Sequence, residues 1–223
     1  MDGTVTAVNN SDNGFSVETA EGKSFFAKKI LLATGIKDIM PEIPGLAECW
    51  GKTVIHCPYC HGYEVKGLKT AVLANGDVAI HYAQLLRQWT NDLTFFTDGP
   101  ATFTSEQKAK LEQHNIKTIE TRVERLVQTG GNLEGIITAD GINHNFPVMY
   151  YRADFELPEF VQKLNLSKDD FGFIKTDDMM QTSAKGIYAS GDCMSMMRAV
   201  ANAVATGNKA GAIINRDLSM ESF

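Results

Sequence analysis

The residues of this chain with the clearest chemistry form one hexapeptide, Cys-Pro-Tyr-Cys-His-Gly at positions 57–62. Two cysteines with two residues between them can cycle between a dithiol and a disulfide, and this spacing favours the nucleophilic thiolate near neutral pH. His61 follows Cys60 directly and can donate or accept the proton that moves. We therefore expect redox catalysis by Cys57 and Cys60 with His61 as proton carrier. The alternative for His61 is a hydrogen-bonded turn histidine.

The same cysteine spacing also occurs in zinc sites. A structural zinc ion needs four ligands in tetrahedral geometry, and the cysteine pair with Cys49 and either His56 or His61 could supply them. However, no second Cys-x-x-Cys and no His-x-x-x-His follows in the sequence, although such paired motifs are typical of zinc-binding proteins. Zinc binding is therefore an alternative, not the favoured interpretation.

Cys-Pro-Tyr-Cys is also the active-site tetrapeptide of glutaredoxins. Their chemistry requires the first cysteine at the N-terminus of a long helix, whose dipole stabilises the thiolate. Here Gly62 and Gly67 follow the pair, and Leu68–Leu73 has the character of a buried strand, which leaves no room for that helix. A purely structural role for two buried cysteines is disfavoured because the proline and glycine of the hexapeptide mark a tight turn.

Length and composition limit the classes of protein to consider. The chain has 223 residues, 43% of them hydrophobic, which is enough for a substantial core in one or two domains. Its net charge of −6 argues against a nucleic-acid surface, which needs clustered basic residues. No apolar run approaches the roughly eighteen residues of a membrane span. Four cysteines and a start at Met1 without an apolar signal segment lead us to expect a cytoplasmic protein.

The elements that must position these residues begin with short strands. Alternating patterns and turn residues predict strands at Thr4–Val8, Gly14–Thr19 and Lys23–Ala27, which together form an antiparallel meander. Lys29–Gly35 then has the pattern of a buried strand that ends in small residues, where a backbone can approach a ligand closely. The prolines of Met40–Gly45 predict an extended linker.

A second group of elements follows the hexapeptide. Strands at Leu68–Ala74 and Leu93–Thr97 flank a helix at Asp77–Trp89, which is a βαβ unit, the building block of a doubly wound sheet. Thr104–His114 is a predicted helix with the spacing of a capping box at its start. Gly135–Asn145 is typical of a hairpin.

The last segment returns to a buried strand. Gly186–Asp192 has this pattern and ends in a Gly-Asp pair. Arg198–Asn215 follows as a helix so rich in alanine and glycine that it must pack closely against its neighbour.

Taken in order, these motifs resemble the thioredoxin reductase-like proteins of the pyridine nucleotide-disulfide oxidoreductase class. The resemblance runs from end to end of the chain, and several motifs in the right order are more specific than any one of them. The matching segments are Ala33-Thr34-Gly35, Ile43-Pro44-Gly45, Cys57 with Cys60, Gly191-Asp192, and Arg198 through Gly207.

The resemblance implies an α/β fold with two Rossmann-like, three-layer domains that bind FAD and NAD(P). The FAD domain would be discontinuous and N-terminally truncated, because nothing before Thr34 resembles the Gly-x-Gly-x-x-Gly turn that holds the ADP half of FAD. The implied domains are an FAD-domain fragment at 1–45, an NAD(P)-binding-like domain with the cysteine pair at 46–147, and a return to the FAD domain at 148–223. We expect weak flavin affinity, poor solubility or association with another chain.

The resemblance also assigns roles at the cysteine pair. Cys60 would lie against the flavin and take electrons from it, and Cys57 would exchange with the substrate disulfide. His61 departs from the common thioredoxin reductases, which have aspartate there, and the Cys-x-x-Cys-His-Gly arrangement looks more like the branch that includes fungal dithiol oxidases. Reductase and oxidase directions both stay open.

Cofactor residues follow by the same resemblance. Those implied for FAD are Thr34, Gly35, Gly191, Asp192, Arg198, Ala199 and Val200. Those implied for the nicotinamide cofactor are Ala74, Gly76, Asp77, Ala79 and Asp98. Ala74 replaces the first glycine of the phosphate-binding turn, and Asp98 stands where NADPH-using relatives have a basic cluster. Since Asp98 would repel a 2′-phosphate, either NADH replaces NADPH or no nicotinamide binds. A plain turn residue is the alternative for Asp98.

Three functions are compatible with the sequence. The favoured one is a flavin-dependent disulfide oxidoreductase that acts on a thioredoxin-like protein or a small disulfide or dithiol, as a homodimer. The second is a non-enzymatic remnant of that family, and the third is a glutaredoxin-like or zinc-binding protein. We expect no nucleic-acid or membrane partner.

Overall fold

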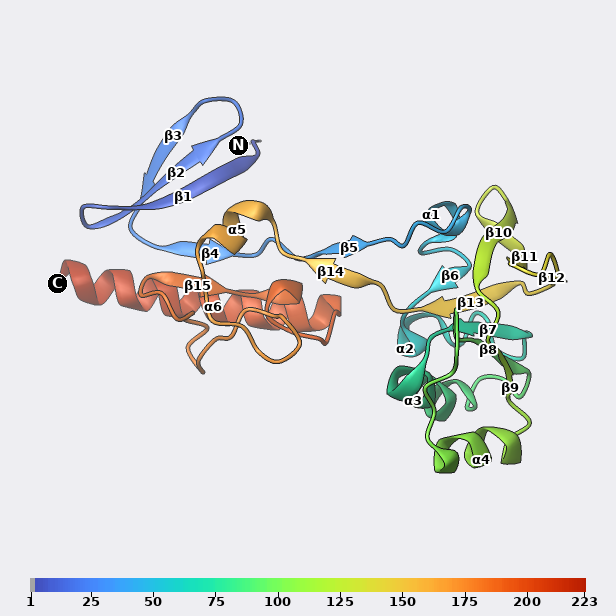
Figure 1. The fold of residues 1–223 in the computed structure, drawn as a ribbon. Coiled ribbons are helices and arrows are strands. Elements are labelled where there is room, and N and C mark those ends of the chain that lie inside the picture. Colours follow the sequence, from blue (N-terminus) through green and yellow to red (C-terminus); the bar gives the residue numbers. More distant parts are fainter. Residues whose placement is uncertain (1–2) are drawn as a thin grey trace. The chain divides into compact units, whose positions relative to one another are not determined.

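The computed structural model describes residues 3–223. Met1 and Asp2, the first residues of the segment in which we expect no signal peptide, lie outside the described residues. The chain forms two compact units (Figure 1). Unit 1 combines the residues up to Asp38 with Phe155–Phe223, and unit 2 is the continuous segment Ile39–Asp154. The strands β5 (Lys37–Ile39) and β14 (Asp154–Glu156) pair where the chain passes from one unit to the other.

Unit 1 begins with the predicted antiparallel meander. Its strands are β1 (Val5–Ser11), β2 (Gly14–Thr19) and β3 (Ser24–Ala27). Asn13 has φ of +63° in the first turn, a conformation that asparagine tolerates better than most residues. Gly14 cannot carry a side chain, because its Cβ would lie 2.5 Å from the Ala27 carbonyl oxygen. The turn chemistry of the sequence therefore sets the register of this sheet.

The centre of unit 1 is a two-stranded parallel sheet made from distant parts of the chain. β4 (Ile30–Leu32) pairs with β15 (Ile187–Ala189), so residues more than 150 positions apart become neighbours. The strand expected at Lys29–Gly35 is shorter in the structure, because its small residues beyond Leu32 pair with no strand. The one-turn 3-10 helix η1 (Gly191–Cys193) follows β15 directly.

Helices and the meander cover the two faces of this small sheet. Ile187 and Ala189 of β15 point into a core shared with the meander and with α5 (Glu159–Lys163), whereas Tyr188 points the other way and donates a 2.6 Å hydrogen bond to Asp217 of α6 (Val200–Ser222). The buried members of this core are Val8, Phe15, Leu32, Leu157, Val161, Leu166, Ile174, Ile187, Ala189 and Cys193. Unit 1 is thus built in three layers.

Unit 2 contains a five-stranded sheet in which every neighbouring pair is parallel. Its strand order is β6 (Val54–Ile55), β13 (Val148–Tyr151), β7 (Thr70–Leu73), β8 (Leu93–Phe96) and β9 (Lys117–Ile119). Two crossover helices, α3 (Gly76–Leu86) and α4 (Ser105–Gln113), join β7 to β8 and β8 to β9. The predicted βαβ unit is confirmed, and so is the capping box of α4, in which Thr104 and Gln107 exchange hydrogen bonds.

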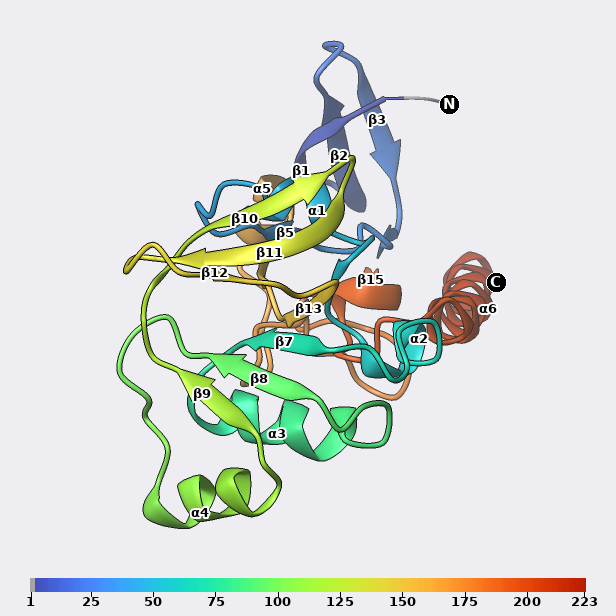
Figure 2. The same ribbon diagram turned by 90° about the vertical axis from the view of Figure 1, so that its right-hand side faces the viewer.

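The two faces of this sheet carry different layers, as Figure 2 shows. Val72, Phe95 and Tyr150 pack against α3 and α4, and their strand neighbours Ala71 and Phe96 pack on the opposite face. That second face is covered by α1 (Leu46–Cys49) and by an antiparallel sheet of β10 (Val123–Thr129), β11 (Asn132–Thr138) and β12 (Asn143–His144). The hairpin predicted at Gly135–Asn145 is the β11–β12 pair, but the sequence reading missed β10.

Helix ends also differ slightly from expectation. The helix predicted from Arg198 to Asn215 is α6, which begins at Val200 and continues to Ser222. It starts two residues late because Ala199 is extended and Arg198 is engaged by Asp38. Within residues 3–223, no helix is both long and apolar enough to cross a membrane.

Candidate active site

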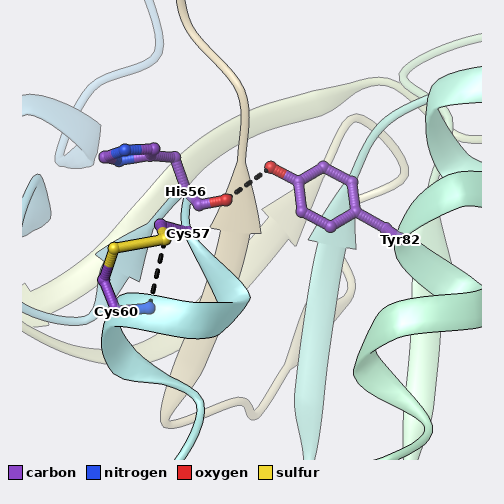
Figure 3. Close-up of a disulfide and its surroundings, with 4 residues drawn as sticks. All are labelled: His56, Cys57, Cys60 and Tyr82. Atoms are coloured by element: carbon purple, nitrogen blue, oxygen red, sulfur yellow. Dashed lines mark hydrogen bonds between the residues drawn. A yellow bond between two sulfur atoms is a disulfide. The ribbon is translucent and has the colours of Figure 1, made fainter. Parts of the chain in front are cut away.

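Cys57 and Cys60 form a disulfide at the start of a single helical turn (Figure 3). Cys57 is the N-cap of α2 (Pro58–His61), and its Sγ accepts a 3.1 Å hydrogen bond from the Cys60 N–H. Proline suits the first helical position, because the missing N–H would have no partner there. The two Cα atoms are 5.3 Å apart, a normal separation for a disulfide. The glutaredoxin alternative needed a long helix, and α2 ends after four residues.

The turn after the pair can only be glycine. A Cβ on Gly62 would lie 2.2 Å from the Pro58 carbonyl oxygen and 2.5 Å from the Trp89 indole. Trp89 packs against the core of α3, so this contact holds α2 close to the body of unit 2. Cys60 is exposed and Cys57 is half-buried. The disulfide is therefore held in place by its surroundings, and Cys60 is the more exposed of its two residues.

Tyr82 of α3 anchors the backbone just before the disulfide. Its hydroxyl donates a 2.9 Å hydrogen bond to the His56 carbonyl oxygen, as drawn in Figure 3. The His56 ring is stacked on Trp50, with ring centroids 5.7 Å apart. Tyr82 is only 4% exposed, and burial raises the pKa of its hydroxyl well above the ordinary value. Sequence reasoning missed Tyr82, although a tyrosine on the inner face of a helix needs a partner for its hydroxyl.

His61, the predicted proton carrier, is the last residue of α2 and is half-buried. Its Nδ1 is buried and has no hydrogen-bond partner among residues 3–223. Among the described residues this nitrogen therefore makes no hydrogen bond to either cysteine sulfur. The role itself stays a prediction.

Unit 1 contains a cavity of about 480 Å³ at the carboxyl ends of β4 and β15. Ligands commonly bind at this end of parallel strands. Six of the seven residues implied for FAD line the cavity: Gly35, Gly191, Asp192, Arg198, Ala199 and Val200. Thr34, the seventh, lies against Cys193 instead. The fold thus brings together residues near positions 35, 191 and 199.

The residues around this cavity fit a flavin. Small side chains line it, and a Cβ on Gly35, which has φ of +62°, would meet no atom within 4 Å. Val200 is 82% exposed and offers an apolar face to a flat ring. Ala199 caps α6 without a side-chain hydrogen bond, and the first turn of α6 carries no acidic residue. The N–H groups at this helix start are therefore free to bind electronegative atoms of a ligand.

Arg198 is held by a partner that the sequence reading did not anticipate. Its guanidinium donates two hydrogen bonds to the Asp38 carboxylate, at 3.0 and 3.1 Å, and both side chains are partly buried. This bidentate arrangement fixes the orientation of the arginine. Arg198 lines the cavity, but its polar end is occupied by Asp38, so we assign it to shaping the site and not to a charge contact with the ligand.

The residues implied for a nicotinamide cofactor lie around the β7–α3 turn. Ala74 directly follows β7 and Gly76 begins α3, whereas Ala79 is fully buried in the core. Asp77 accepts a 2.8 Å hydrogen bond from Gln107. Asp98 accepts a 2.7 Å hydrogen bond from the Val123 N–H. Each of these two carboxylates thus already has a partner inside the protein.

The other two cysteines are free and fully buried. Burial raises the pKa of the Cys49 thiol. Burial also raises the pKa of Cys193, against a smaller lowering by its hydrogen bonds with Ser190 and Thr34. Cys49 lies in a core cluster of unit 2, and Cys193 lies in the core of unit 1. Throughout the part of the chain that the structure describes, no three His, Cys, Asp or Glu side chains lie together in a metal-binding group.

Comparison with known proteins places this arrangement in context. The sequence profile of the pyridine nucleotide-disulphide oxidoreductases matches residues 1–207. The thioredoxin reductase sirT of Leptosphaeria maculans is 31% identical over 219 residues, covering 92% of this chain and 67% of sirT. The structure of TrxB from Bacillus anthracis has a TM-score of 0.92 at 29% identity, covering 100% of this chain and 76% of that chain. An oxidoreductase from Agrobacterium tumefaciens is 34% identical with a TM-score of 0.88, covering 99% and 74%.

Proposed function

The chain belongs to the pyridine nucleotide-disulphide oxidoreductase family, and from this premise we propose that it performs dithiol–disulfide exchange at Cys57 and Cys60, with a flavin bound in the cavity of unit 1. The family and the Rossmann-type α/β fold expected from the sequence are confirmed. The observation that carries the proposal is the disulfide at the N-cap of α2, closed at the surface of unit 2.

The exchange step itself needs only the two cysteines and the substrate. When the pair is reduced, the Cys57 thiolate attacks one sulfur of a substrate disulfide, and the substrate S–S bond breaks as a mixed disulfide forms. The Cys60 thiolate then attacks the Cys57 sulfur, which releases the substrate as a dithiol and closes the disulfide. Two electrons and two protons pass to the substrate. The reverse sequence oxidises a substrate dithiol.

His61 would carry one of these protons. His61 follows Cys60 directly in α2, and in this proposal its imidazole takes a proton from one thiol and returns it to the departing sulfur. A flavin, when bound, would supply or accept the two electrons that reset the cysteine pair. Gly35, Gly191, Asp192, Ala199 and Val200 would hold it.

The substrate in this proposal is a thioredoxin-like protein or a small disulfide or dithiol. The name of the relative sirT, a thioredoxin reductase, supports this class. The homodimer and the cytoplasmic location expected above stay predictions, and sedimentation of the purified protein tests the first of them.

Thiol trapping tests the exchange chemistry. Reduced wild-type protein treated with dithionitrobenzoate is expected to release two thionitrobenzoate ions per chain and to close its disulfide. Cys60→Ser should release one and retain the other as a mixed disulfide on Cys57, because the second thiol is absent. Cys49→Ala is the control and should behave as wild type. If the reduced wild type did not form the Cys57–Cys60 disulfide at a measurable rate, the proposal would be contradicted.

Spectroscopic titration with FAD tests the cavity. Ala203→Phe places a large ring among the lining residues and should abolish binding, whereas Ala205→Phe, on the same helix but outside the lining, should leave it unchanged. Equal binding by both variants would contradict the assignment of the cavity. If the wild-type protein binds no FAD and exchanges no disulfide, the alternative of a non-enzymatic remnant of the family is favoured instead.

A further inference from the structure

We propose that the β7–α3 turn of unit 2 is closed to nicotinamide dinucleotides by this chain's own side chains. The family is named for pyridine nucleotides, and the corresponding turn in such proteins is where the pyrophosphate binds. In this chain the residues at the turn do not fit that group. The inference concerns binding alone and does not depend on the exchange chemistry proposed above.

Asn75 occupies the place that a phosphate oxygen would take. It is the N-cap of α3, and its Oδ1 accepts three hydrogen bonds: from the Gly76 N–H at 2.8 Å, the Thr102 N–H at 2.9 Å and the Thr102 hydroxyl at 3.1 Å. A phosphate-binding turn works because the first N–H groups of the helix are free to point at the anion. Here the first of them, the Gly76 N–H, already donates to an amide oxygen that the neighbouring loop also uses, so an arriving phosphate would have to displace that oxygen.

The other end of the Asn75 amide locks the same loop in position. Its Nδ2 donates to the Pro100 carbonyl oxygen at 3.0 Å and to the Thr97 carbonyl oxygen at 3.4 Å. The loop is close enough that a Cβ on Gly76 would lie 3.0 Å from the Thr102 hydroxyl oxygen. The segment from Thr97 to Thr102 therefore lies against the helix start and is tied to the Asn75 side chain by four hydrogen bonds.

The charges around the turn also disfavour a dinucleotide. Asp77 lies in the first turn of α3. A negative side chain there interacts favourably with the positive end of the helix dipole, which is the same interaction that a bound phosphate would make. Asp98 and Glu120 accept backbone hydrogen bonds from Val123 and Ala101, so both carboxylates are fixed near the loop. The basic residues beside this loop include Arg122 and Lys108, which are both exposed. Three fixed carboxylates would repel the two negative charges of a pyrophosphate.

Helix α6 of the same chain provides the contrast. Its N-cap, Ala199, makes no side-chain hydrogen bond, and its first turn has no acidic residue. It opens on a cavity, whereas the start of α3 is filled by Asn75. The chain thus keeps one helix N-terminus open to a ligand and closes the other.

Direct binding measurements test the proposal. We expect titration calorimetry of the wild type with NADH and with NADPH to give dissociation constants weaker than about 1 mM, a binding free energy of no more than about 4 kcal/mol. Asn75→Gly combined with Asp98→Arg should free the helix N–H groups and reverse one charge, and should tighten NADPH binding at least tenfold. Ser105→Ala, on the exposed start of α4, is the matched control and should change nothing.

Two outcomes would overturn the proposal. One is micromolar binding of NADH or NADPH by the wild type that persists in Ala203→Phe, since that variant fills the cavity of unit 1. Binding that disappears in Ala203→Phe belongs to that cavity and supports closure of the turn. The other is a dissociation constant that does not tighten in the double variant although thermal unfolding shows it folded. Neither result depends on whether Cys57 and Cys60 exchange disulfides, so the two proposals fail independently.

Discussion

The disulfide owes its position to side chains outside the hexapeptide. Tyr82 holds the carbonyl of His56, and Trp89 closes against Gly62. Tyr150 lies beside Tyr82, with ring centroids 5.9 Å apart, but its buried hydroxyl has no hydrogen-bond partner among the described residues. These two tyrosines are equally deep in the core and differ in what their hydroxyls do.

That difference makes Tyr82→Phe and Tyr150→Phe a matched pair. Tyr82→Phe should lower the free energy of unfolding by about 0.5–1.5 kcal/mol, because the partly buried His56 carbonyl loses this donor. It should also change the rate at which the reduced cysteine pair closes, because the backbone before Cys57 is no longer anchored. Urea unfolding and stopped-flow thiol reoxidation measure the two effects.

Tyr150→Phe should leave the rate of disulfide closure unchanged and should not destabilise the protein, since it removes a hydroxyl that pairs with nothing. Equal effects of the two substitutions would show that the Tyr82 hydrogen bond does not position the disulfide.

The buried tyrosines also predict an alkaline loss of stability. Burial raises the pKa of Tyr150 and of Tyr188 from 10 to about 12. Below pH 10 both are protonated in the folded and unfolded chains, and their contribution is fully present. As the pH rises from 10 to 12 the unfolded chain releases these protons first, so the contribution is lost. Urea midpoints at pH 8, 10 and 11 should fall, and less steeply in Tyr150→Phe; an identical fall in that variant would contradict the assignment.

Single residues show what the sequence could and could not predict at the site. The cysteine pair was expected from its residue types and spacing, and six residues of the cavity lining were expected from the family resemblance. Asp38 and Tyr82 were not, because their partners, Arg198 and the His56 carbonyl, are 160 and 26 residues away. Asn75 did carry a signal, since asparagine directly before a helix is a favoured N-cap.

Among the elements, the start of α6 is held by the Asp38–Arg198 pair. Asp38→Asn should weaken this pair, let the turn before Val200 move and reduce FAD affinity by about 5–30-fold, which corresponds to about 1–2 kcal/mol. Lys37→Ala is the control, because its ion pair with Glu156 is exposed and contributes little. Titration with FAD measures both variants. Unchanged affinity in Asp38→Asn would show that the ion pair does not shape the cavity.

Elements with local signals were predicted well, and those fixed by distant partners were not. The capping box of α4 needs only Thr104 and Gln107, three residues apart, and it forms as expected. β10 was missed because its strand character depends on β11 and on burial against the sheet of unit 2. β4 is shorter than its apolar run, because β15 pairs with only three of its residues.

At the scale of the whole molecule, each unit has a core of its own. Unit 1 has one buried cluster, and unit 2 has one on each face of its sheet. Both tryptophans of the sequence, Trp50 and Trp89, belong to unit 2. Intrinsic fluorescence therefore reports on unit 2 alone, whereas far-ultraviolet circular dichroism reports on both units.

FAD should accordingly stabilise the two units unequally. A ligand that binds only the folded form of unit 1 raises the unfolding temperature of that unit by mass action. With increasing FAD, the transition followed by circular dichroism should move to higher temperature, and the midpoint followed by tryptophan fluorescence should move less. Equal shifts by both probes would place the flavin contacts in unit 2 or show that the two units unfold together.

The pairing of β4 with β15 also sets an order of events during synthesis. β4 leaves the ribosome more than 150 residues before β15, while all five strands of the unit 2 sheet lie between them. At a translation rate of about 5–20 residues per second, β15 is synthesised about 8–30 seconds after β4. Unit 2 can finish folding in that interval, while β4 keeps an unpaired strand edge until β15, in the last third of the chain, is translated.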